Sequence, residues 1–107
     1  MILTVTPNPS VDLLFEADEL CWDDANRVEM PRRRAGGQGV NLTRAARVLG
    51  GESVVIAFFG GVTGAELKLL LDDDATPYID VPIAHDSRVF VAVRERSTGR
   101  SMLINPR

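Results

Sequence analysis

The run Ser53–Phe59, SVVIAFF, constrains the fold of this chain more than any other feature. It is nearly continuous in apolar residues, and glycine pairs bound it at 50–51 and 60–61. Such runs are typical of strands buried on both faces of a parallel sheet. Apolar residues at helical spacing in 39–49 and in 64–73 predict a helix before the run and another after it. The centre of the chain therefore has the pattern helix, strand, helix.

Two further strands complete a small α/β core. Residues 2–6 are a β-branched run that stops before a proline, and 78–81 is a candidate third strand. Strands and helices that alternate in this way predict a right-handed α/β arrangement with parallel strands. The remaining extended stretches are surplus to that core, and we expect them to form a small separate antiparallel sheet: 11–15, 27–31, 88–95 and 101–105.

Charge and the scarcity of cysteine and histidine exclude several classes of function. The chain has 107 residues, one domain's worth, and its net charge of -3 argues against nucleic acid as the main partner. A lone Cys21 permits no intrachain disulfide or CxxC metal site, and a lone His85 permits no metal centre or Ser-His-Asp triad. The start MILTVTPNP lacks the basic and apolar regions of a signal peptide, and no apolar run approaches the roughly 20 residues that span a bilayer. We expect a cytoplasmic protein with no membrane partner and no resident metal.

The stretch AGGQGVN places three glycines immediately before a helix. A glycine turn at a helix N-terminus lets a polar or anionic ligand approach the backbone N–H groups, although it is equally compatible with a tight turn that binds nothing. It matches neither the dinucleotide pattern GxGxxG nor a P-loop. Asp12 follows the first strand at the sheet edge where α/β proteins bind ligands, and Asn41 lies in the helix. A carboxylate and an amide together suit a ligand rich in hydroxyl groups.

Four stretches, in matching order, resemble the N-terminal third of PfkB-type sugar kinases of the ribokinase superfamily. The similarity is greatest to the branch that phosphorylates phosphosugars, such as 1-phosphofructokinase, tagatose-6-phosphate kinase and the minor 6-phosphofructokinase. The resemblance implies a partial Rossmann-like, three-layer α/β core with a small antiparallel β lid over the sugar. The stretches are TVTPNPSVD, RVEMPRRRAGGQGVNLTRAARVLGG, VVIAFFGGVTGAEL and DSRVFVAVRERSTGRSMLIN.

The same resemblance assigns roles to individual residues. Sugar hydroxyls would be held by Asp12, Gly36, Gly37 and Asn41, and the existing phosphate of the substrate would lie near Arg27 and Arg88. Arginine suits that role because its fork can bind two phosphate oxygens at once. Arg32, Arg33 and Arg34 have no counterpart in the resemblance, and we interpret them as a solvated face of the lid.

The sequence departs from the family pattern at two points. Gln38 stands where many members of the branch have lysine, which leaves the identity of the phosphosugar open. The GAGD-type turn that carries the catalytic aspartate and the anion hole does not occur in the 107 residues. The sequence therefore predicts no catalytic residue here, and ATP and Mg²⁺ are implied for the full-length kinase rather than for this chain.

Other functions stay open. The chain could be a noncatalytic phosphosugar-binding module, or a module that forms a homodimer through its lid strands. It could also be part of a ribokinase-like or nucleoside kinase with a different substrate.

Overall fold

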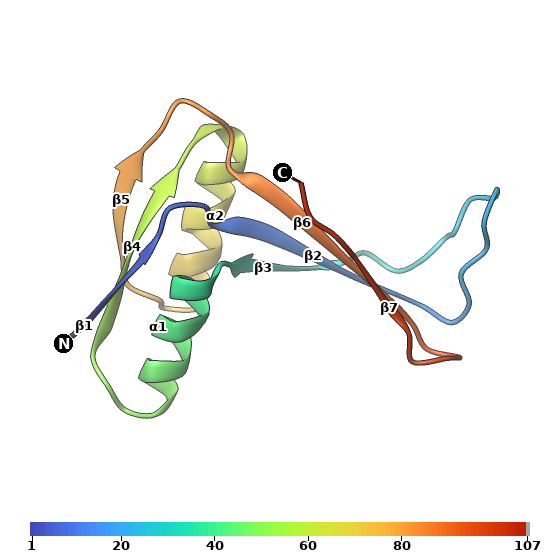
Figure 1. Cartoon of the computed structure of the whole chain (residues 1–107), viewed down its shortest axis with the longest axis horizontal. Coiled ribbons are helices and arrows are strands. Elements are labelled where there is room, and N and C mark those ends of the chain that lie inside the picture. The colour runs from blue at the N-terminus through green and yellow to red at the C-terminus, as the bar shows by residue number, and fades with distance from the viewer. Residues whose placement is uncertain (107) are drawn as a thin grey trace.

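The computed structural model describes residues 1–106. In chain order the elements are β1 (Ile2–Thr6), β2 (Ser10–Ala17), β3 (Arg32–Gly36), α1 (Gln38–Val48), β4 (Ser53–Phe59), α2 (Gly61–Asp73), β5 (Tyr78–Pro82), β6 (Arg88–Glu95) and β7 (Ser101–Ile104). Figure 1 shows a core sheet with the two helices packed on it. A second sheet, with the strand order β3-β2-β6-β7, extends away from this core. We call the second sheet the lid sheet.

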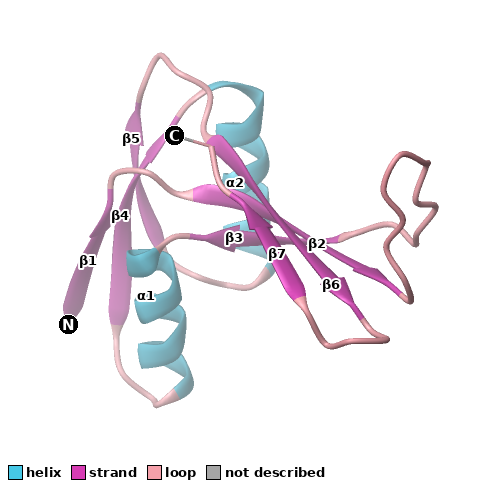
Figure 2. Ribbon diagram, turned by 45° about the vertical axis from the view of Figure 1, so that its right-hand side comes forward, coloured by secondary structure: helices cyan, strands magenta, loops and turns pink. Residues whose placement is uncertain are grey.

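The core sheet has the strand order β1-β4-β5, and neighbouring strands in it run parallel. Both helices pack on one face of this sheet (Figures 1 and 2). These observations confirm the predicted α/β fold class. Within residues 1–106 a helical layer covers one face of the sheet only, so the described residues make up two of the three expected layers.

The burial of β4 alternates along the strand. Val55 and Ala57 face the helices and are 0% exposed, whereas Ile56 faces the other side and is only half-buried. On the same uncovered side, Leu3 and Val5 of β1 are each 59% exposed. The expectation that β4 is buried on both faces is therefore wrong for the described residues, because no element in 1–106 packs on the second face.

The lid sheet is mixed rather than wholly antiparallel. Its two outer pairs, β2 with β3 and β6 with β7, are antiparallel, but the central pair of β2 and β6 is parallel. Parallel pairing needs a long crossover connection, and α1, β4, α2 and β5 of the core lie between these two strands in the sequence. The antiparallel expectation holds only where strands are joined locally, as in the hairpin of β6 and β7.

The strand expected at 27–31 begins later than predicted. Residues 27–31 have no regular structure. β3 starts at Arg32, which pairs with Leu14 of β2, and the antiparallel pairing runs from there to Gly36 and Ser10. Proline has no N–H to donate to a sheet, so pairing starts only after Pro31. Val28, which lies within the expected strand, is exposed. The other lid strands overlap the expected ranges.

Neither helix of the described residues is long and apolar enough to cross a membrane.

Candidate functional site

Asp12 lies near the start of β2, where the lid sheet joins the core, and its carboxylate packs against Gly36. In the register of β2 and β3, Ser10 pairs with Gly36 and Asp12 with Arg34. A Cβ built on Gly36 would overlap the Asp12 carboxylate. The Ser10 hydroxyl donates a hydrogen bond of 2.5 Å to Asp12 Oδ1, whereas none of the described residues donates to Oδ2. Glycine at position 36 therefore makes room for a fixed carboxylate.

Gly37 and Gly39 let the first turn of α1 approach the end of β1. Gly37 is the N-cap of α1 and has φ +123°, a conformation that side chains other than glycine rarely adopt. A Cβ on Gly37 would lie 2.6 Å from Cγ2 of Thr6, and a Cβ on Gly39 would overlap the Thr6 hydroxyl. The glycines of this turn thus serve close packing inside the chain as well as any ligand.

Buried hydroxyl groups join β1 and β4 to α1. Thr4 Oγ1 donates to the carbonyl of Gly39 at 3.0 Å and lies 2.7 Å from Thr43 Oγ1. Thr43 Oγ1 in turn lies 3.0 Å from Ser53 Oγ. Thr6 is 4% exposed, yet its hydroxyl has no hydrogen-bond partner among the described residues. A buried unpaired hydroxyl is destabilising, and this one lies beside the glycine turn.

The N-terminus of α1 has no side-chain cap. The first N–H groups of any helix have no partner within the helix and carry a partial positive charge. The N-cap Gly37 supplies no side-chain hydrogen bond, and the first turn of α1 contains no acidic residue. An oxygen-rich ligand could therefore accept hydrogen bonds from these N–H groups, close to the Asp12 carboxylate.

Asn41 lies in the first turn of α1, and its side chain contacts Arg44. Arg44 Nη1 donates to Asn41 Oδ1 at 3.2 Å, and Arg44 Nη2 donates to the carbonyl of Ala35 at 2.9 Å. The same guanidinium forms a salt bridge of 2.8 Å with Asp74, just beyond the end of α2. Arg44 therefore connects the predicted ligand residue Asn41 to β3 and to the second helix.

Arg88 begins β6 and pairs with Ser10, two residues from Asp12. Its side chain donates from Nε to the carbonyl of Asn8 at 3.2 Å and from Nη1 to Asn105 Oδ1. The preceding residue, Ser87, is 6% exposed and is hydrogen-bonded to the N-terminus of α2 through Gly60 and Thr63. The start of β6 is thus fixed, and the structure brings Arg88 to the same end of the lid sheet as Asp12.

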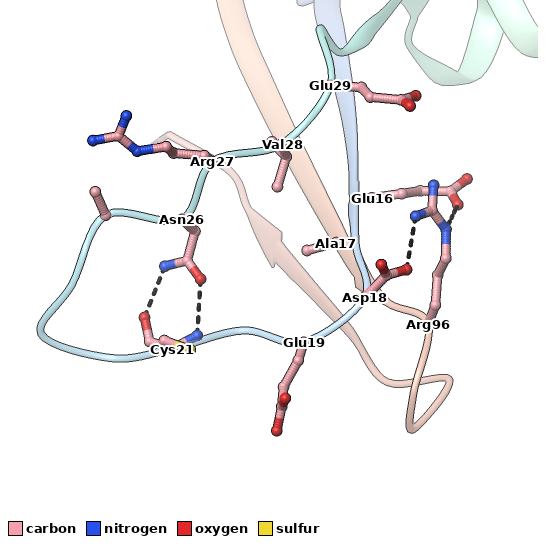
Figure 3. A pocket seen from close by; sticks show the side chains of 11 residues that line it. Glu16, Ala17, Asp18, Glu19, Cys21, Asn26, Arg27, Val28, Glu29 and Arg96 are labelled. Atoms are coloured by element: carbon pink, nitrogen blue, oxygen red, sulfur yellow. Dashed lines mark hydrogen bonds and ion pairs between the residues drawn. The ribbon is translucent and has the colours of Figure 1, made fainter.

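Arg27 does not join this group within one chain. It lies in the irregular segment beyond the far end of β2 and lines a hollow with Glu16, Asp18 and Arg96 (Figure 3). Arg96 bridges both carboxylates at 3.0 Å, and these hydrogen bonds, with Asp18 first, raise the pKa of its guanidinium. The side chain of Arg27 extends away from them in Figure 3. Arg27 therefore lies apart from Asp12 and Arg88 within the chain, because the strand expected at 27–31 starts only at Arg32. Its expected place near a substrate phosphate stays a prediction.

Three residues near the candidate site were not predicted. Arg34 is exposed, as the sequence predicts, but it also pairs with Asp12 across the lid sheet and lines a hollow together with Asn41 and Arg44. The contact of Arg44 with Asn41 could have been found from their i, i+3 spacing on a helix. Thr6 carries no sequence signal, because its unpaired hydroxyl depends on how closely α1 approaches β1.

No group of three or more His, Cys, Asp or Glu side chains in the described part of the chain is arranged to hold a metal ion.

Known proteins similar to this chain are sugar kinases. It is 36% identical over 99 residues to ATP-dependent 6-phosphofructokinase isozyme 2 of Mycobacterium tuberculosis, a match that covers 92% of this chain and 29% of the relative. It is 32% identical over 93 residues to tagatose-6-phosphate kinase of Staphylococcus epidermidis, which covers 87% of this chain and 30% of that relative. No protein-family model matches the chain.

A solved structure of a sugar kinase is also similar to this chain. Phosphofructokinase-2 from Escherichia coli, in complex with fructose-6-phosphate, superposes with a TM-score of 0.92 at 30% identity, over 98% of this chain and 35% of that one. The chain therefore spans about a third of the length of the proteins that it matches. In sequence and in fold, these 107 residues are homologous to the N-terminal portion of the PfkB-family phosphosugar kinases.

Proposed function

We propose that this chain is the acceptor-sugar-binding part of an ATP-dependent phosphosugar kinase that acts on fructose 1-phosphate, fructose 6-phosphate or tagatose 6-phosphate. The observation that carries the proposal is the Asp12 carboxylate, held against Gly36 beside the uncapped N-terminus of α1. The relatives support it, since their names describe kinases of fructose 6-phosphate and tagatose 6-phosphate.

The chemistry of the site fits such a ligand. Asp12 accepts hydrogen bonds from sugar hydroxyl groups, while the N–H groups of the α1 N-terminus and the Asn41 amide interact with sugar oxygens. Arg88, at the neighbouring strand start, is the cation available to the phosphate that the sugar already carries. Arg27 could reach that phosphate only from a second chain, because it lies beyond the far end of β2.

Phosphoryl transfer needs more than this site. A kinase positions a nucleotide and Mg²⁺ in line with an activated hydroxyl. The 107 residues contain no GAGD-type turn, and Asp12 acts here as a ligand for hydroxyl groups rather than as a catalytic base. We therefore expect ATP and Mg²⁺ to serve the full-length kinase in the cytoplasm, and this chain alone to bind a phosphosugar without phosphorylating it.

Calorimetric titration of this chain tests the proposal. The ligands are fructose 6-phosphate, fructose 1-phosphate, tagatose 6-phosphate, unphosphorylated fructose and ATP. The proposal predicts that a phosphosugar binds more tightly than fructose and that ATP does not bind measurably. Equal weak binding of all five would contradict it, as would consumption of ATP by the chain alone when a fructose phosphate is added.

A second candidate function, self-association through the lid, rests on the exposed edge strand β7. Met102, Leu103 and Ile104 of this strand are 39%, 66% and 54% exposed, and within residues 1–106 β7 pairs with β6 on one side only. An apolar strand with a free edge favours pairing with another strand. Light scattering should then give a mass that rises with concentration for the native chain and stays monomeric for Leu103→Lys. A monomeric mass at all concentrations for the native chain would exclude this function.

A further inference from the structure

The side-chain amide of Asn41 has a defined orientation. Arg44 donates to it from Nη1 at 3.2 Å, and a guanidinium has only donors and no acceptor. The atom of Asn41 that faces Arg44 must therefore be its carbonyl oxygen, however the amide is assigned. The amide nitrogen occupies the opposite branch of the side chain, and none of the described residues accepts a hydrogen bond from it.

Arg44 is itself held firmly enough to impose this orientation. Its side chain is 15% exposed, and its Nη2 donates to the carbonyl of Ala35 at 2.9 Å. Nε and Nη2 both donate to Asp74 Oδ2, at 3.1 and 2.8 Å. The guanidinium plane is thus fixed by groups from β3 and from the end of α2, and only its Nη1 is directed to Asn41.

We propose that Arg44 is a positioning residue that fixes Asn41 as a hydrogen-bond donor, so that the amide nitrogen binds an oxygen of the acceptor sugar. The inference rests on the proposed function and adds a direction to it, since the resemblance alone leaves open whether Asn41 donates or accepts. Asp12 then accepts hydrogen bonds from sugar hydroxyl groups, and the Asn41 amide nitrogen donates a hydrogen bond to a sugar oxygen.

The variant Asn41→Asp separates this role from a structural one. Aspartate has the same shape, so it keeps an acceptor toward Arg44 and forms a charge-assisted pair with it. It also places a negative charge in the first turn of α1, which is favourable to the helix dipole. The midpoint of thermal unfolding should therefore stay the same or rise. The variant has no N–H group to donate, so its affinity for fructose 6-phosphate should fall about tenfold or more.

Variants of Arg44 and Asp74 test the positioning step. Arg44→Met frees the amide to rotate, and affinity should fall about threefold or more. Arg44→Lys keeps a donor-only group near Asn41 and should restore part of that loss. Asp74→Asn is the matched control, because asparagine keeps an oxygen that accepts hydrogen bonds from the guanidinium and removes only the charge, without touching Asn41. Its affinity should stay within about twofold of the native chain.

Calorimetric titration with fructose 6-phosphate, together with thermal unfolding of each variant, tests whether Arg44 positions Asn41 as a donor. Three results together support the proposal. The native chain binds the sugar, Asn41→Asp is as stable as the native chain but binds weakly, and Arg44→Lys binds better than Arg44→Met. Native affinity in Asn41→Asp would overturn it, since the ligand would then need an acceptor or nothing from residue 41. Losses in Arg44→Met and Asp74→Asn that simply follow their unfolding temperatures would also overturn it. If the native chain binds no sugar, the proposed function fails first and takes this inference with it.

Discussion

Gly36 and the carboxylate of Asp12 are in such close contact that a single methyl group added at position 36 would overlap the carboxylate oxygens. The two residues lie on adjacent antiparallel strands of the lid sheet, and the Ser10 hydroxyl donates a hydrogen bond to the carboxylate. The absence of a side chain at position 36 thus fixes the place of the charged group on which the proposed sugar site depends.

Gly36→Ala should displace Asp12 and so weaken sugar binding. Insertion of a methyl group into this packed contact should cost about 1–3 kcal/mol of stability, and affinity for fructose 6-phosphate should fall by more than about tenfold. Gly99→Ala is the control: Gly99 has φ +71° with open space around it, so alanine there costs about 1–2 kcal/mol through backbone strain alone. Both variants should lose stability, but only Gly36→Ala should lose affinity. Equal affinity in the two, measured by calorimetry, would contradict this reading of the contact.

Thr6→Val and Thr4→Val should change stability in opposite directions. Valine has the shape of threonine, so Thr6→Val keeps the packing under Gly37 and removes the buried unpaired hydroxyl, which should raise the free energy of unfolding by about 1 kcal/mol. Thr4→Val leaves the Gly39 carbonyl without its hydroxyl donor and should lower the free energy of unfolding by about 1–3 kcal/mol. Urea titrations with unchanged slopes measure both effects. A destabilised Thr6→Val would mean that the hydroxyl is already hydrogen-bonded in the free chain.

Arg88→Gln should weaken binding of phosphosugars selectively. Hydrogen bonds to a charged group contribute about 1.5–3 kcal/mol, so affinity for fructose 6-phosphate should fall about tenfold or more while that for fructose stays the same. Arg94→Gln removes the same charge from an exposed position farther along β6 and serves as the control. Added salt should reduce the difference between Arg88→Gln and the native chain. A parallel loss for fructose and its phosphate would remove Arg88 from the phosphate site.

Glu95 should make the lid hairpin sensitive to acid. The Thr98 hydroxyl and then the Leu20 N–H donate to its carboxylate, and both lower the pKa of Glu95 from its ordinary value of 4.5. Because the folded pKa is depressed, this stabilisation is present above the unfolded value and is lost as the pH falls from 4.5 through the lower folded value. The unfolding temperature of the native chain should exceed that of Glu95→Gln at neutral pH and approach it in acid. A constant difference across that range would show that the carboxylate is not the group responsible.

Local patterns predicted most of the core. The apolar run of β4 between glycine pairs and the helical spacing on either side gave the correct order of elements, because each depends on neighbours in sequence. The second face of β4 could not be judged in this way, since a strand carries the same apolar residues whether or not a further layer covers it. The parallel pairing of β2 and β6 was also beyond sequence pattern, because the strands are about 70 residues apart in the chain.

The candidate site was predicted in part. The structure brings Asp12, Gly36, Gly37, Asn41 and Arg88 to one end of the lid sheet, and whether they bind a sugar stays a prediction. Arg27 lies apart from them, because the strand expected at 27–31 starts only after Pro31, and its place near a phosphate also stays a prediction. Contacts that depend on three-dimensional packing were not predicted, such as that of Thr6 with Gly39 or of Arg44 with Ala35.

The most direct test of the account is calorimetric titration of the native chain and of Asp12→Asn with fructose 6-phosphate, with circular dichroism as a check that both are folded. Asparagine keeps the shape of the side chain but loses the charge that accepts hydrogen bonds from sugar hydroxyls. The account predicts saturable binding by the native chain and an affinity lower by about tenfold or more for the folded Asp12→Asn variant. Native affinity in Asp12→Asn, or no binding by the native chain, would contradict the claim that these residues form an acceptor-sugar site.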